Sequence, residues 1–257
     1  MWTKKLPRDP EARMSFLDHL DELRSRLIVS AAAIGLGFVV ALAFIRYVFD
    51  FVMRPLQQAL PPGGRLIYTE PAEAFLLYLK IAALVGAVLA APVVLWQLWL
   101  FVAPGLYANE KRYVLPFVLF STVFFVLGAA FSHYVLFPLA WRFFAGFSSD
   151  YVEFLPRIEP VFSLYAKLML GMGLVFQMPT LVLFLARIGV VTAGMLLRHF
   201  KYAVLAIFVI AAVVTPSPDA LSQVLVAAPM LVLYGLSVLI AWVFGRPRAV
   251  AEEARET

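Results

Sequence analysis

The chain has 257 residues, of which 63% are hydrophobic and only 14% are charged, whereas an ordinary soluble domain has about 45–50% apolar and about 25% charged residues. A soluble core cannot cover this much apolar surface, so the composition indicates an integral membrane protein. The formal net charge of +5 is too small and too dispersed for a nucleic-acid binder. The absence of cysteine excludes a disulfide framework, a thiolate metal site and a cysteine nucleophile.

Residues 15–26 have the spacing of an amphipathic helix. Apolar side chains recur at intervals of three and four residues from Phe16 to Leu27. Glu22 and Arg26 lie four residues apart on the polar face, and spacing alone favours a solvated pair worth a few tenths of a kcal/mol. We expect this helix to lie along the membrane surface.

Six apolar runs then predict six membrane-spanning helices, since about 20 apolar residues cross about 30 Å of hydrocarbon. The runs lie at about residues 27–45, 76–103, 113–141, 162–186, 200–215 and 220–244. They lack the alternation of barrel strands, and backbone groups in lipid must be bonded internally, so the fold class is all-α. We expect a single integral-membrane domain over residues 1–257. Prolines in several runs predict bent helices that form a concave bundle.

The fifth run is short for a full crossing. It has 14 apolar residues, 202–215, before the break that holds Pro216 and Pro218. Either the helix extends back through Phe200 and Leu196, or the fifth and sixth runs form a hairpin that stops short of the far surface and thins the bilayer there.

The distribution of basic residues predicts the orientation. Six spans place both termini on one side, where the connecting segments carry 14 Lys and Arg residues, against 5 on the other side. The positive-inside rule makes both termini cytoplasmic, with residues 245–257 as a cytoplasmic tail. We expect no cleavable signal peptide before the first span.

Catalytic and metal-binding patterns are missing from the sequence. The three histidines His19, His133 and His199 are scattered, and no phosphate-binding loop or Gly-x-Ser-x-Gly occurs. We therefore expect a protein that is not an enzyme and has no metal or cofactor, and in which His133 is satisfied by a neighbouring helix.

The alternative that the residues leave open is an ion- or proton-coupled small-molecule transporter, which six bent spans would suit. Such carriers usually have charged residues at mid-membrane and internal repeats. We find neither here, because Lys80 and Lys167 are close enough to helix ends to reach the headgroups.

Four stretches together resemble the TatC family, the polytopic subunit of the twin-arginine protein translocase. They are FLDHLDELRSRL at 16–27, APVVLWQLWLFVAPGLYANEKR at 91–112, FPLA at 137–140 and TPSPDALSQ at 215–223. The resemblance covers about residues 14 to 245, with the motifs in the family's order. It implies a receptor and scaffold in the bacterial, archaeal or organellar cytoplasmic membrane, driven by the proton gradient. It also implies self-association and TatA- and TatB-like single-span partners.

The resemblance further implies that the N-terminal region and the first cytoplasmic loop bind signal peptides with two consecutive arginines. The matching residues are Glu22, Arg24, Phe101, Pro104, Leu106, Tyr107 and Glu110. A carboxylate suits this ligand because it accepts two parallel hydrogen bonds from a guanidinium. Without the resemblance, Glu110 would be interpreted as a partner of Lys111 or Arg112.

Other matches imply structural or partner-contact roles. These positions are Pro55, Phe75, Pro92, Gln177, Asp219 and Gln223. We expect Pro55 at the start of the first outer loop, Pro92 to shape the concave face, and Asp219 also to cap the sixth helix. Gln177 stands where many relatives have Glu. It keeps a hydrogen-bonding side chain but cannot titrate.

Overall fold

The structure, a computed structural model, describes residues 16–59, 66–102, 114–147, 155–215 and 219–245. Within these ranges the chain is mostly helical, joined by short turns and loops, and its only β-structure is one isolated bridge between Ile67 and Arg157. The α-helices are α1 (Phe16–Ala43), α2 (Ile45–Ala59), α3 (Glu73–Val102), α4 (Val114–Phe131), α5 (Phe137–Ala145), α6 (Ile158–Val175), α7 (Met178–Arg187), α8 (Ala193–Arg198), α9 (Phe200–Val214) and α10 (Ala220–Phe244). The all-α class predicted from the sequence is confirmed.

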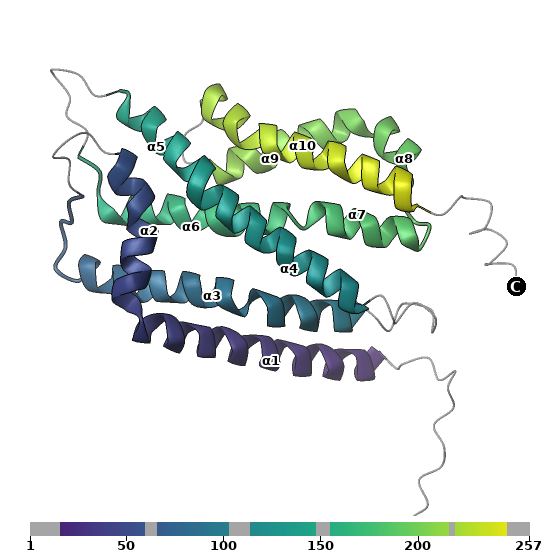
Figure 1. Ribbon diagram of the computed structural model, residues 1–257, viewed down its shortest axis with the longest axis horizontal. Helices are drawn as coiled ribbons and strands as arrows, with labels where there is room; N and C mark the ends of the chain where they lie inside the picture. The colour runs from purple at the N-terminus through teal and green to yellow at the C-terminus, as the bar shows by residue number, and fades with distance from the viewer. Residues whose placement is uncertain (1–15, 60–65, 103–113, 148–154, 216–218, 246–257) are drawn as a thin grey trace, which may run out of the picture.

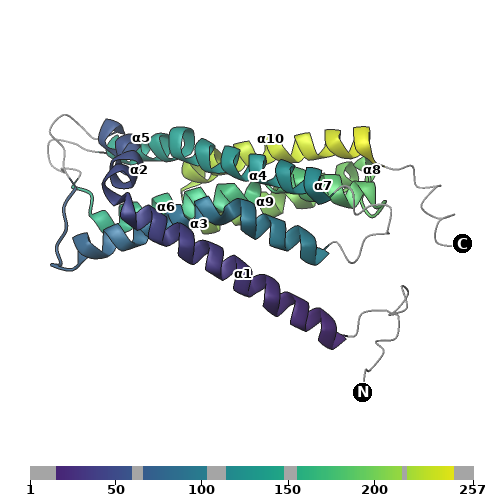
Figure 2. The same cartoon turned by 60° about the horizontal axis from the view of Figure 1, so that its bottom comes forward.

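Six helical stretches account for the predicted spans. Five are long and apolar enough to cross a membrane, and α9 is a shorter apolar helix. One long stretch combines α4 and α5 through the π-helical turn Ser132–Leu136, and another combines α6 and α7. Figures 1 and 2 show that α1 begins and α10 ends at the same end of the bundle. An even number of crossings requires this arrangement.

The first helix differs from its expectation. Phe16–Ala43 is one continuous helix, so residues 15–26 do not form a separate element along the membrane surface. Two side chains of this segment are instead attached to α3: His19 stacks on Phe101 and Arg26 donates to Gln97. Tertiary contacts with α3 keep the amphipathic segment in line with the span.

The first outer loop contains a helix that the apolar runs did not predict. Figure 1 shows α2 lying across the direction of α1 and α3. Val52 and Leu56 are buried on one face, while Arg46 and Asp50 are exposed on the other. A search for charge-free runs passes over such an amphipathic helix. Pro55 therefore lies in the first outer loop as expected, but inside a helix of that loop, α2, where it is buried.

The helices α1 and α3 cross closely at two glycines. A Cβ atom added to Gly37 would lie 2.4 Å from the Gly86 carbonyl oxygen, and one added to Gly86 would lie 2.5 Å from the Phe38 backbone nitrogen. Small residues allow such backbone contact, which drives helix association in membranes where the lipid is as apolar as the side chains. This crossing determines where α1 lies, because most of its remaining surface is exposed.

Two spans are irregular, one at a proline and the other at a buried histidine. Pro179 at the start of α7 lacks an N–H to continue the ladder of α6, and the helix is interrupted at Phe176 and Gln177. In the π-helical turn, His133 is buried, with Nδ1 at 2.8 Å from the Tyr165 hydroxyl and its ring stacked on Phe51. The prediction that neighbouring helices satisfy His133 is confirmed.

The short fifth span extends back only to Phe200. His199 separates α9 from the short helix α8, whose N-cap Thr192 accepts a hydrogen bond from the Met195 amide. A helix of 15 residues is about 22 Å long at about 1.5 Å per residue, against about 30 Å of hydrocarbon. The span that stops short is therefore the alternative that the structure favours for α9, whereas α10 has the length of a full crossing.

Candidate functional site

The described candidates for signal-peptide binding lie where the N-terminal end of α1 meets the C-terminal end of α3. Glu22 and Arg24 are on α1, and Phe101 is in the last turn of α3. These two ends lie side by side at the right of Figure 1. Pro104, Leu106, Tyr107 and Glu110 lie outside the described residues.

A polar chain joins the two helices at this end. Arg26 Nη2 donates to Glu22 Oε1 at 3.0 Å, and Arg26 Nη1 donates to Gln97 Oε1 at 3.2 Å. The carboxylate side chain is 16% exposed and the guanidinium side chain 31%. Arg26 therefore holds Glu22 through one turn of α1 and connects it to α3.

This chain leaves two polar atoms unsatisfied. Glu22 Oε2 and Arg26 Nε are buried and have no hydrogen-bond partner among the residues that the structure describes. An unmade bond of a buried charged group costs about 1–3 kcal/mol or more. Within the described part of the chain, Glu22 Oε2 is thus an acceptor without a donor.

An aromatic pair lies beside the carboxylate chain. The rings of His19 and Phe101 stack with their centroids 4.4 Å apart. His19 is one turn before Glu22 and Phe101 is one turn after Gln97, so the stack and the polar chain connect the same two helices. Arg24 is exposed on α1 and adds a positive charge close by. The structure thus brings Glu22, Arg24 and Phe101 to one end of the molecule.

Gln177 lies in the interior of the bundle. Its side chain is 9% exposed, and its Nε2 donates to the Ser121 carbonyl at 2.9 Å. The Ser121 hydroxyl in turn accepts from Trp99 Nε1 at 2.7 Å. The three residues come from three different spans, so Gln177 has a hydrogen-bonding role within its own bundle.

The start of α10 is fixed by two of the candidate residues. Asp219 caps the helix, its carboxylate accepting from the Ser222 amide at 2.7 Å, as the sequence predicted. Gln223 Nε2 donates to the Phe208 carbonyl of α9 at 2.7 Å. The second bond ties α10 to the short span beside it.

The remaining two candidates are exposed. Pro92 lies inside α3 and Phe75 lies in its first turn with 64% of its surface exposed. The core of the chain does not use the Phe75 ring.

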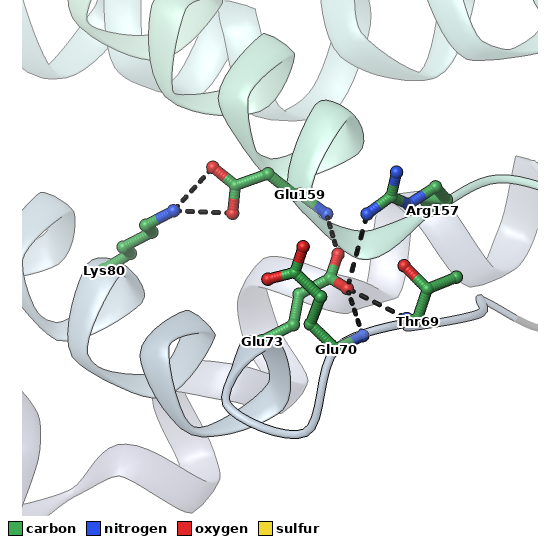
Figure 3. A network of polar contacts seen from close by, with 6 residues as sticks. All are labelled: Thr69, Glu70, Glu73, Lys80, Arg157 and Glu159. Carbon is green, nitrogen blue, oxygen red and sulfur yellow. Dashed lines mark hydrogen bonds and ion pairs between the residues drawn. The ribbon is translucent and has the colours of Figure 1, made fainter.

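At the opposite end of α3 the structure contains an ionic cluster that was not predicted from the sequence (Figure 3). The buried Glu73 carboxylate accepts from the backbone N–H groups of Thr69 at 3.0 Å, Glu70 at 3.5 Å and Glu159 at 3.2 Å. Arg157 Nη2 lies 3.8 Å from the same carboxylate. These contacts attach the loop before α3 to the start of α6.

Lys80 belongs to the same cluster. Its Nζ lies 2.6 Å from both carboxylate oxygens of Glu159. The sequence predicts only that Lys80 reaches the headgroups, whereas the structure pairs it with a carboxylate of another span. The sequence did contain one indication of this cluster: Glu73 and Lys80 are seven residues apart and therefore lie on nearly the same face of the helix. No such spacing identifies Glu159, which is far away in sequence.

Comparison with known proteins identifies a family. Residues 18–229 match the family model described as Sec-independent protein translocase protein (TatC). The chain is 42% identical over 243 residues to the TatC of Desulforapulum autotrophicum, covering 95% of this chain and 90% of that protein. It is 43% identical over 223 residues to the TatC of Helicobacter pylori strain J99, covering 87% of each.

Solved structures agree with the sequence relatives. A crystal structure of the twin-arginine translocase receptor TatC is 36% identical and superposes with a TM-score of 0.76, covering 87% of this chain and 97% of the other. A second structure of the receptor, in the detergent DDM, gives a TM-score of 0.78 at the same identity. The family model covers most of the chain, and the relatives match nearly their whole length. This chain therefore belongs to the TatC family of Sec-independent protein translocase proteins.

Proposed function

We propose that this chain is the receptor and scaffold of a twin-arginine export system, and that it binds the signal peptides of precursors at the ends of α1 and α3. The observation that supports the site most directly is the Glu22 carboxylate, which has one buried oxygen without a donor among the described residues. An arginine of the ligand supplies the missing N–H group. The family relationship gives no support to the transporter alternative.

The chemistry of the site suits arginine more than lysine. A guanidinium is planar and donates in a fork that matches a carboxylate, whereas an ammonium is a compact point charge. The stacked rings of His19 and Phe101 beside Glu22 provide an aromatic face on which a guanidinium can lie. We assign the second arginine to Glu110, and further contacts with the peptide to Pro104, Leu106 and Tyr107, because the family resemblance implies these roles.

The proposal includes an orientation and a set of partners. Both termini face the cytoplasm, so the Glu22 site receives precursors before export. TatA- and TatB-like single-span subunits and further copies of the chain complete the complex in the cytoplasmic membrane, and the chain acts without catalysis or a cofactor. Reporter fusions test the orientation: we expect an external signal after residue 150 and cytoplasmic signals after residues 108 and 250.

Peptide binding to the purified full chain tests the receptor function. We expect the twin-arginine peptide to bind and the twin-lysine version to bind much more weakly. Loss of a charge-assisted bond costs roughly 1.5–3 kcal/mol, so Glu22→Gln and Glu110→Gln should each weaken binding by about one to two decades. Glu159→Gln is the matched control, since it removes a carboxylate of α6 that pairs with Lys80, far from the Glu22 site. If both site variants keep the affinity of the unmodified chain and its preference for arginine over lysine, then Glu22 and Glu110 do not bind the arginine pair.

We also propose that Gln177, Asp219 and Gln223 support the assembly by fixing the surfaces that partner helices contact. Gln177→Leu removes the bond to the Ser121 carbonyl, and an interhelical bond of this kind contributes on the order of 1 kcal/mol. We expect a lower unfolding temperature with peptide binding retained. Normal stability combined with reduced crosslinking to a partner subunit would instead mean that the side chain acts directly on the partner.

A further inference from the structure

We infer that Arg26 is an internal competitor of the ligand: in the empty receptor it occupies part of the Glu22 carboxylate that an arginine of the signal peptide takes on binding. This inference rests on the proposed function of Glu22. It assigns to Arg26 a role in setting the affinity and specificity of the site, in addition to its contacts with Glu22 and Gln97.

The ion pair is incomplete in a specific way. A full side-on pair between a guanidinium and a carboxylate uses two N–H groups and both oxygens. Here Arg26 uses Nη2 on Oε1 of Glu22 and directs Nη1 away to Gln97. Arg26 Nε and Glu22 Oε2 are left buried and unbonded within the described part of the chain. The resident arginine therefore makes a weaker pair than a ligand guanidinium can make with the same carboxylate.

Gln97 makes the exchange feasible. When a ligand guanidinium takes both Glu22 oxygens, Arg26 loses a charged partner but keeps the neutral acceptor Gln97 Oε1 on α3. Its side chain is also 31% exposed, so water can hydrate the guanidinium that is released. Displacement of Arg26 thus leaves no isolated buried cation.

The same ion pair stabilises the Glu22 carboxylate when no peptide is bound. The Glu22 side chain is only 16% exposed, and a carboxylate with so little contact with water is destabilised without a counter-charge. Arg26 supplies that charge until the ligand arrives. The ligand then exchanges one guanidinium for another, and the carboxylate is paired in both states.

A purely structural role for Arg26 predicts the opposite result from a competitor. If Arg26 only holds Glu22 in position, its removal weakens peptide binding. If it competes, its removal strengthens binding. The two substitutions Arg26→Met and Arg26→Lys decide between these roles. Lysine keeps the positive charge but cannot contact Glu22 and Gln97 as a fork, so it separates competition from simple repulsion of a cationic ligand.

The experiment measures the Kd of a twin-arginine signal peptide for the purified full chain in detergent at two salt concentrations. Since a partly exposed ion pair contributes up to about 1 kcal/mol, we expect roughly three- to fivefold tighter binding in Arg26→Met and a smaller tightening in Arg26→Lys. Both changes should disappear in a Glu22→Gln background, where there is no carboxylate to compete for.

The outcomes separate this inference from the receptor assignment. Weaker binding in either Arg26 variant with a native unfolding temperature, or a tightening that persists in the Glu22→Gln background, overturns the competitor role. Unchanged binding in Glu22→Gln alone overturns the assignment of Glu22 itself. If Arg26→Met does not fold, Arg26→Lys decides alone, and an affinity equal to that of the unmodified chain counts against competition.

Discussion

One carboxylate lies near each end of α3, Glu73 of α3 itself at one end and Glu22 of α1 at the other, but the two groups are bonded very differently. At one end, Glu73 accepts three backbone N–H groups and lies near Arg157. At the other end, Glu22 of α1 accepts from Arg26 on one oxygen, and its second oxygen has no donor among the described residues. We call these the Glu73 end and the Glu22 end.

The difference separates a carboxylate bonded by structural contacts from the carboxylate that we propose binds the ligand. At the Glu73 end the donors come from the loop before α3 and the start of α6, so the carboxylate connects segments that the sequence separates. At the Glu22 end the described bonds come from α1 and α3 alone, and one acceptor stays open. We expect substitutions of Glu73 to reduce stability and substitutions of Glu22 to reduce binding.

The largest effect should come from the crossing that places α1, on which the Glu22 end depends. Gly37→Val adds a side chain whose Cβ would lie 2.4 Å from the Gly86 carbonyl oxygen, and backbone cannot move aside as a side chain can. Overpacking of this kind costs about 1–3 kcal/mol. We expect a lower unfolding temperature and loss of peptide binding together.

Gly35→Val is the matched control, because a Cβ at Gly35 meets no atom within 4 Å. It should leave the unfolding temperature and the Kd unchanged. If Gly37→Val binds peptide normally, then the position of α1 against α3 does not form the site, and the contrast between the two ends loses its basis.

The next effect concerns the Glu73 end alone. Glu73→Ala leaves three backbone N–H groups and Arg157 without their acceptor, so we expect a clearly lower unfolding temperature. The Kd of the folded fraction for the twin-arginine peptide should not change. Glu70→Ala provides the comparison, because that side chain is exposed. Weaker peptide binding in folded Glu73→Ala would show that the two ends are coupled.

The smallest effect is expected for the exposed ion pair of the Glu73 end, which joins Lys80 and Glu159. The side chains of Lys80 and Glu159 are 40% and 52% exposed, so their ion pair should contribute only about 0.2–1 kcal/mol. Lys80→Met should lower the unfolding temperature slightly, and the difference should shrink at high salt because screening weakens the pair in the unmodified chain. A loss as large as that of Glu73→Ala would mean that the pair is structurally central despite its exposure.

Local features of the sequence, such as apolar runs and helix caps, predicted the structure best. Apolar runs of known length predict spans because lipid requires every backbone group to be bonded within its own helix. The Asp219 cap was predictable for the same reason, since it depends on a residue three positions away. Helix α2 was missed because its charged face interrupts the apolar run, although its other face is buried in the core.

The candidate site was only partly predictable. The motifs identified Glu22 and Phe101 as members of one surface through the family resemblance. No pattern in the sequence indicated that Arg26 would donate to Gln97, which is 71 residues away, or that His19 would stack on Phe101. For Gln177 the sequence left two roles open, and the bond to the Ser121 carbonyl supports the one within the bundle.

By itself, the sequence determined that the chain lies in a membrane, that it is helical, and how many spans it has. Hydrophobicity and backbone hydrogen bonding determine these properties within a single run of residues. The tertiary structure decided which carboxylate is saturated with hydrogen bonds and which has an oxygen without a donor among the residues that the structure describes. Glu22 and Glu73 are the same residue type near the ends of apolar helices, and only their neighbours in space differ. Those neighbours are brought together by packing such as the Gly37–Gly86 crossing, which depends on atoms remote in sequence.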